Sequence, residues 1–176
     1  MVDVLRAATF APSAENKQPW EFVVVRDPDA RRVIGDITAR AWAAGGRAYS
    51  ESRLDPKLLA DVDAGATGGI AAAPVLIVIC GDTSRGNERV MPASIFPAAQ
   101  NLMLAAGALG LGTALTTLPT AMRSDLTQLL HLPDHVVPMA VIPLGHPAKP
   151  LGPPRRDPVE RHIHRDRFAG PADPAH

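Results

Sequence analysis

The stretch APSAENKQPW, residues 11–20, joins an apolar helical pattern over residues 2–10 to a strand pattern over residues 20–25. Pro12 and Ser13 end the helix, because a proline disfavours helical backbone in the residue before it. The strand pattern, WEFVVV, is mostly apolar and rich in β-branched residues, which predicts a buried strand. A segment that joins a helix to a buried strand is expected at the edge of the core.

Within this stretch, the uncharged polar side chains of Ser13, Asn16 and Gln18 lie between Pro12 and Pro19. The prolines restrict the path of the backbone, and the hydroxyl and amide groups both donate and accept hydrogen bonds. A stiff, neutral loop of this kind suits a flat heterocycle with alternating donors and acceptors. A capped helix end followed by a turn is the other interpretation that the spacing leaves open.

The rest of the chain alternates helical and strand patterns. Helices are predicted over residues 27–44, 58–62, 91–109 and 119–130, and strands over residues 74–80, 113–118 and 135–144. Gly45 and Gly46 should end the second helix before a polar connection over residues 45–56, and residues 67–69 should loosen the chain. A further turn of helix is expected at 158–163. Because the strands are apolar on both faces, helices should cover both sides of one α/β or α+β sheet.

Charge and cysteine content exclude several classes of function. The 176 residues contain 18 basic and 18 acidic residues, which argues against a nucleic-acid partner and against an anionic membrane surface. The apolar stretches are far shorter than the ~20 residues of a membrane helix, and the first residues do not resemble a signal peptide. Cys80 is the only cysteine, so a reducing, cytoplasmic location and an inert core thiol are expected.

The run AATFAPSAENKQPWEFVVV, residues 7–25, resembles the signature A-P-S-x-x-N-x-Q-P-W-x-F of the nitroreductase family. Later segments resemble that family in the same order along the chain: the strand at 74–80, AQNL at 99–102, GALGLG at 107–112, LP at 132–133, PLGHPA at 143–148 and RDPVE at 156–160. The resemblance therefore covers residues 2–168.

The resemblance implies an α+β fold with a central, mostly antiparallel sheet flanked by helices. It implies one nitroreductase-like domain over residues 1–168, and residues 169–176 are expected to form a disordered tail. It also implies an intertwined homodimer that holds FMN at the subunit interface, with residues from both chains.

Residue by residue, the resemblance implies three groups of contacts. The cofactor-binding residues would be Pro12, Ser13, Asn16, Gln18, Gly110, Leu111, Gly112, Arg155 and Arg156. A guanidinium suits a phosphate through its bidentate geometry, whereas a solvated charged tail is the alternative for the two arginines. Trp42 and Tyr49 are assigned to the substrate side, with packing at the dimer interface as the alternative for Trp42. No catalytic residue is singled out, because a flavin itself supplies the redox chemistry.

The function implied is reduction of nitroaromatic, quinone or related acceptors by NAD(P)H, in a ping-pong order. Two alternatives remain open: a flavin-binding or flavin-sequestering relative without turnover, and a flavin-dependent dehydrogenase of a biosynthetic pathway. The family usually carries an R-R-S-x-R-x-F stretch that clasps the FMN phosphate, and neither Arg6 nor Arg26 matches it. A start set too late, another way of holding the phosphate, and weak or absent FMN binding are the three explanations left open.

Two further patterns are set aside. Gly107, Gly110 and Gly112 follow a helix and precede a strand, which is the reverse of a dinucleotide-binding turn. His162 and His164 lie in a charged segment without nearby cysteines, so a solvated surface is favoured over a metal site.

Overall fold

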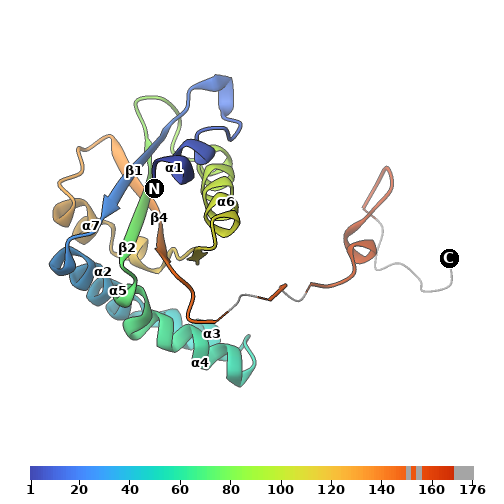
Figure 1. The fold of residues 1–176 in the computed structure, drawn as a ribbon. Helices are drawn as coiled ribbons and strands as arrows, with labels where there is room; N and C mark the ends of the chain where they lie inside the picture. The colour runs from blue at the N-terminus through green and yellow to red at the C-terminus, as the bar shows by residue number, and fades with distance from the viewer. Residues whose placement is uncertain (150–151, 154–155, 169–176) are drawn as a thin grey trace.

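The computed structural model describes residues 1–149, 152–153 and 156–168, and these are built around one antiparallel sheet (Figure 1). Its strands are β1 (Trp20–Val25), β2 (Val75–Asp82), β3 (Gly112–Thr113) and β4 (Val136–Gly145). Their order is β1-β2-β4-β3, and each neighbouring pair is antiparallel. The predicted α+β fold and antiparallel sheet are therefore confirmed. The predicted tail, residues 169–176, lies outside the described residues.

Helices cover both faces of the sheet, as the apolar strands predict. Helices α1 (Val2–Ala8) and α6 (Pro92–Ala108) pack on the face that carries Ile77 and Ile79. The opposite face carries Leu76 and Val78 and is covered by α2, α5 and α7 (Figure 1). The bounds of these three helices are Pro28–Ala41, Ile70–Ala72 and Arg123–Leu129. Successive residues of a strand point to opposite faces, which is why one apolar strand serves two cores.

Aspartates begin two of the helices. The Asp27 carboxylate accepts from the Ala30 N–H at 2.8 Å, and Pro28 occupies the first turn of α2, as predicted. Asp55 does the same for α4 (Pro56–Ala64), accepting from the N–H groups of Lys57 and Leu58 at 3.0 Å each. Both helices therefore start where the sequence places an Asp-Pro pair.

The predicted polar connection over residues 45–56 is wrong, because most of it is helical. After α2 the chain passes through η2 (Trp42–Gly46), where the non-helical backbone of Gly45, with a φ of 163°, forms a kink between two helices. The second helix therefore ends at this glycine pair, as predicted, but Gly46 returns to helical backbone and α3 (Arg47–Glu51) follows at once. Residues 67–69 belong to a π-helical turn, η3 (Gly65–Gly69).

The predicted third strand and fourth helix are also altered. Only Gly112–Thr113 forms strand β3; a single bridge between Thr116 and Val141 follows it. The helical stretch then begins as a 3₁₀ turn, η4 (Leu118–Met122), before α7. Pro119 occupies the first turn, and the Thr120 N–H bonds to the Thr117 carbonyl at 3.0 Å, which closes a tighter turn than an α-helix.

Cys80 lies in the core, as predicted. It is fully buried in β2, and this burial raises the pKa of its thiol to about 12, with a smaller contribution from the charge of Glu21. Among the described residues, no helix is long and apolar enough to cross a membrane. A last short turn, η5 (Val159–His162), stands apart from the body of the molecule (Figure 1).

Replacement of Gly35 by alanine is predicted to destabilise the protein. A Cβ at Gly35 would lie 2.5 Å from the Ala71 Cβ, so α2 and α5 would have to separate. We expect Gly35→Ala to lower the free energy of unfolding by about 1–3 kcal/mol in urea denaturation. Gly68→Ala is the matched control, because nothing lies within 4 Å of its Cβ position; it should be neutral or slightly stabilising. Equal stability of the two variants would contradict the close packing of α2 on α5.

Candidate functional site

The loop between α1 and β1 has a strained backbone. Glu15, Asn16 and Gln18 have φ angles of 54°, 52° and 51°, in the left-handed region that L-residues other than glycine seldom adopt. Glu15 and Asn16 lie in a short 3₁₀ turn, η1 (Ala14–Asn16). Three such residues within four positions persist only where surrounding contacts fix the backbone.

Hydrogen bonds supply that restraint. Inside the loop, the Gln18 N–H donates to the Ser13 hydroxyl oxygen at 3.0 Å. From α6, the buried Ser94 hydroxyl oxygen accepts from the Ala14 N–H at 3.3 Å. At the far end, the Pro19 carbonyl accepts from the Asp82 N–H at 2.7 Å. The loop is therefore held to the first turn of α6 and to the end of β2.

A buried carboxylate at the end of β2 completes this anchor. Asp82 accepts from the Ser84 hydroxyl at 2.6 Å and from the Ser84 N–H at 2.9 Å, and it forms an ion pair with Arg85 at 3.1 Å. Arg85 also reaches the Gln18 carbonyl at 3.4 Å. The Ser84 hydroxyl is the main cause that holds the pKa of Asp82 below its usual range, and the Ser84 N–H and the charges of His135 and Arg85 lower it further.

The polar side chains of the loop remain open to solvent. Pro12, Asn16 and Gln18 are exposed, and the Gln18 amide donates to the Asn16 side-chain oxygen at 3.3 Å. A rigid backbone thus presents neutral amides outward, as the sequence predicts.

The second predicted group, Gly110–Gly112, follows the last turn of α6. Gly110 has a φ of 73°, and the Leu111 N–H turns back to the Ala106 carbonyl at 2.9 Å. This geometry favours glycine, because a side chain at Gly110 would be strained. The chain then enters β3 and the exposed residues Ala114 and Leu115.

A hollow of about 300 Å³ lies beside this segment. One wall comes from α4, η3 and α5, and the other from the chain after β3 and from β4. Its lining is mostly apolar and consists of Asp61, Val62, Gly65, Ala66, Ile70, Ala114, Leu115, Thr116, Leu118 and Pro143. Ala114 and Leu115 are exposed residues of this lining. A volume of this size is at the lower end of ligand sites.

One chain does not bring the two predicted groups together. Ser94 contacts the 11–18 loop near the start of α6, and Ala106 contacts Leu111 near its end. The helix rises about 18 Å between these two residues. Figure 1 shows the loop and β3 at opposite ends of α6. A compact ligand touching both groups would need one group from each of two chains.

The other predicted residues have varied surroundings. Trp42 is only 3% exposed, and its indole N–H donates to Asp63 at 2.8 Å. Tyr49 is exposed, with the Arg53 guanidinium 3.9 Å from its ring centre. Neither residue lines the hollow. Arg156 is exposed, and Arg155 lies outside the described residues.

Sequence reasoning missed the polar anchors Asp82, Arg85 and Ser94, and it missed Asp63 as the partner of Trp42. The bond between Ala14 and Ser94 spans 80 positions, and the bond between Trp42 and Asp63 spans 21. No local pattern links residues so far apart. The one available signal was the presence of Asp82 directly after an apolar strand.

A family model, the nitroreductase family, matches residues 1–146. This chain belongs to the nitroreductase family. The resemblance drawn from residues 7–25 is thereby confirmed.

Individual relatives agree with this assignment. A "Putative NADH dehydrogenase/NAD(P)H nitroreductase" from Methanothermobacter thermautotrophicus is 33% identical over 154 residues, which are 85% of this chain and 66% of the relative. A solved structure of the same description from Parabacteroides distasonis is 26% identical with a TM-score of 0.68, covering 94% of this chain and 83% of that one. An iodotyrosine deiodinase bound to FMN and 3-iodo-L-tyrosine shares the fold, with 23% identity, a TM-score of 0.73, and coverage of 95% and 86%. The chain thus spans just under two thirds of the length of the archaeal relative.

Removal of the Ser84 hydroxyl is predicted to weaken the Asp82 anchor in a pH-dependent way. A carboxylate whose folded-state pKa is lowered stabilises the fold above its unfolded-state pKa, and this contribution is lost as pH falls through the folded-state pKa. Ser84→Ala should raise the pKa of Asp82 and lower the free energy of unfolding at pH 7 by about 1 kcal/mol. The gap to the wild type should narrow as pH falls, measured by urea denaturation between pH 7 and pH 3.

Ser84→Thr, which keeps a hydroxyl, is the control, and its free energy of unfolding should depend on pH as that of the wild type does. A gap between Ser84→Ala and the wild type that is constant across this pH range would show that the hydroxyl does not act through Asp82.

Proposed function

We propose that this chain is an FMN-dependent oxidoreductase that uses NAD(P)H to reduce nitroaromatic, quinone or related acceptors, and that it works as a homodimer. Membership of the nitroreductase family supports the reaction class. The observation that carries the two-chain site is the separation of its halves, with the 11–18 loop at one end of α6 and residues 110–116 at the other.

The groups at both ends have the chemistry that a flavin needs. The exposed amides of Asn16 and Gln18 both donate and accept, which matches the alternating polar edge of the ring. The exposed residues Ala114 and Leu115 border an apolar hollow at the other end. Gly65 and Gly68 leave open space where a Cβ would stand, so a flat ring can approach the backbone of η3. These residues fit an FMN ring and its ribityl chain.

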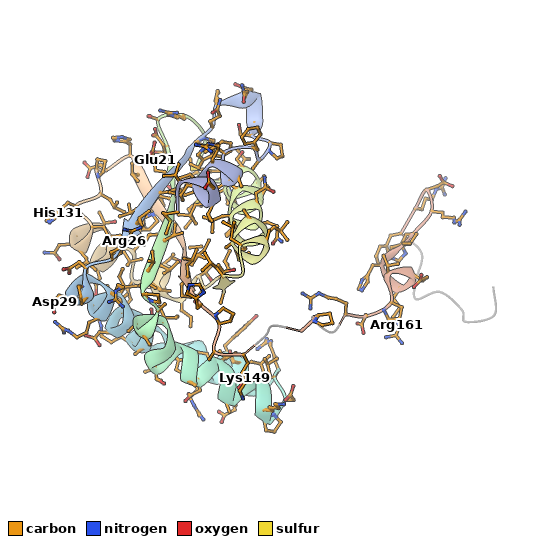
Figure 2. All side chains as sticks on the ribbon, in the orientation of Figure 1. Glu21, Arg26, Asp29, His131, Lys149 and Arg161 are labelled. Carbon is orange, nitrogen blue, oxygen red and sulfur yellow. The ribbon has the colours of Figure 1, made fainter. Side chains whose placement is uncertain are left out.

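An uncharged face of α6 supports the homodimer. The sequence of α6 contains no Asp, Glu, Lys or Arg. Its exposed residues recur at helical spacing, and Leu104 is 62% exposed. They are Ala93, Phe96, Gln100, Leu104, Gly107 and Ala108. The labelled charged residues Glu21, Arg26 and Asp29 are exposed and lie on or beside β1 and α2, away from α6 in sequence (Figure 2). A mostly apolar helix without any charged side chain is normally covered by another element, so a second copy is the natural cover.

The segment after β4 also suits an intertwined dimer. Arg161 and η5 lie away from the body of this chain (Figure 2). Val159, Ile163 and Phe168 are exposed there, and the Phe168 ring lies 4.1 Å from that of His164. Exposed apolar side chains on an extended segment are the features expected where a chain crosses onto its partner.

The proposed role of this chain's residues is to bind the cofactor and to orient it. Bound FMN would accept a hydride from NAD(P)H and pass electrons to the acceptor. The Asp82–Arg85 anchor keeps the 11–18 loop rigid, which fixes the orientation of its amides at the ring. The apolar walls of the hollow exclude water beside the ring. If NAD(P)H and the acceptor occupy the same cleft, the oxidised nicotinamide must leave before the acceptor binds, and ping-pong kinetics result.

The test is a flavin titration followed by turnover. The purified protein should quench the fluorescence of added FMN with a stoichiometry of one per chain. With NADH or NADPH and 1,4-benzoquinone it should then oxidise the nicotinamide at a rate that saturates in both substrates, with parallel double-reciprocal lines. Failure to bind FMN would refute the proposal. Binding without nicotinamide oxidation would instead favour a sequestering relative.

Charges on the exposed face of α6 are predicted to break the dimer and the flavin site together. Gln100→Glu and Leu104→Glu each place a carboxylate on that face in both copies, where pairing would leave it without a cation. We expect the dimer dissociation constant to rise at least about tenfold, measured by light scattering, and FMN affinity to fall with it. Gln128→Glu adds the same charge to α7, on the other side of the sheet. This control variant should leave the dimer dissociation constant and the FMN affinity unchanged. A wild-type monomer that binds FMN fully would contradict the two-chain site.

A further inference from the structure

The helical hairpin formed by α3 and α4 is bounded by glycine-rich segments at both ends. The segment before it, η2, has the sequence WAAGG and is kinked at Gly45, and the segment after it, η3, is a π-helical turn with the sequence GATGG. Glycine gives the backbone freedom to bend where the hairpin leaves and rejoins the body. Figure 1 shows the hairpin lying across one end of the sheet.

Apolar burial does little to hold this hairpin. None of the nine residues of α4, all of which the structure describes, is buried, and the same is true of the five residues of α3. Helices usually gain their stability from a buried apolar face. The position of α4 must therefore depend on a few specific polar contacts.

One carboxylate makes those contacts. Asp63, in the last turn of α4, accepts from the Trp42 indole N–H at 2.8 Å and from the Arg47 guanidinium at 3.3 Å. Arg47 is also paired with Glu51 at 3.2 Å. Because Trp42 is almost fully buried at the end of α2, it gives α4 a fixed point on the body. We call Asp63, Trp42 and Arg47 the clasp.

The clasp is connected to both walls of the hollow. Val62 and Gly65, close to Asp63 in sequence, line one wall, and Leu118 lines the other. A Cβ at Gly46 would lie 2.9 Å from the Trp42 ring and 3.0 Å from Leu118, so the backbone at Gly46 is packed between them. The positions of both walls are thus fixed by contacts with Trp42. The distance between the two walls therefore depends on the hydrogen bond from Trp42 to Asp63.

We propose that Asp63 is a positioning residue that sets the width of this hollow and thereby selects the acceptor by the width of its ring system. The inference rests on the proposed function and deepens it. An apolar hollow with walls held at a fixed separation admits flat, uncharged rings and rejects wider ones sterically. With the clasp open, the glycines of η2 and η3 let α4 move outward and admit the wider ring.

The first measurement is hydrogen exchange on the FMN-free protein, which requires no activity. Asp63→Ala and Trp42→Phe should each raise the exchange rates of residues 56–69 about tenfold, because each removes one partner of a hydrogen bond to a charged group. Asp63→Asn keeps a side-chain acceptor for the indole N–H and should restore most of the protection. Asp36→Ala removes an exposed carboxylate from α2 and is the matched control, with no change expected at residues 56–69.

The second measurement compares a narrow acceptor, 1,4-benzoquinone, with a wide and equally uncharged one, 9,10-phenanthrenequinone. In Asp63→Ala and Trp42→Phe, the ratio of kcat/KM for the wide acceptor to that for the narrow one should rise about tenfold. The change should come from a lower KM for the wide acceptor, with kcat for benzoquinone unchanged. The double variant should show no larger change in this ratio than Asp63→Ala alone, because Asp63→Ala already removes the bond from Trp42 together with the one from Arg47.

Three outcomes would overturn the proposal. They are an unchanged ratio, an equal loss with both acceptors, or the same shift in Asp36→Ala. A wild-type protein that binds FMN but reduces neither quinone would refute the proposed function and the selection of acceptors with it. The exchange rates would still show whether Asp63 holds α4, so the two failures are distinguishable.

Discussion

The packing of α6 on the sheet constrains the rest of the molecule. Its buried side is built from Ile95, Leu102 and several alanines, whose small side chains let the helix approach α1 and the strands closely. The same helix positions the 11–18 loop at its first turn and residues 110–112 at its last. Because the helix is straight enough to lie along one face of the sheet, these two segments cannot approach each other within a chain. Its outer side is uncharged, so one element both divides the site and offers the surface on which a second copy would restore it.

The parts of the fold that follow from periodicity were predictable from the sequence. The strand at 20–25 is mostly apolar and ends in three valines, the strand at 74–80 is a continuous apolar run, and α6 repeats its apolar residues every three or four positions. The position of the 11–18 loop at the edge of the core follows from the elements on either side of it. The resemblance of this loop to the nitroreductase family was also predictable from the sequence, because the signature residues are contiguous.

The parts that depend on pairing between distant polar groups were not predictable. Residues 45–56 contain Arg, Ser, Glu and Asp, a composition typical of a loop, yet α3 forms there because Arg47 is paired with Glu51 and with Asp63. The left-handed backbone at Glu15 and Gln18 also runs against local preference. It depends on Ser94 and Arg85, which lie far along the chain. In each case tertiary contacts override local propensity, and no single-chain pattern reports them.

The two sides of the site differ in how firmly they are held. The 11–18 loop has a strained backbone, and its restraint comes from β2 and from α6, both of which belong to the core. A loop of this kind has one conformation and suits a partner of constant shape, such as a cofactor that stays bound. The α3–α4 hairpin lacks buried residues of its own and is bounded by glycine-rich turns. Its position is defined by one carboxylate, so small changes around Asp63 can alter the hollow without disturbing the sheet or the loop. Under the proposed function, cofactor binding and acceptor selectivity would therefore lie on parts of the fold that can change independently.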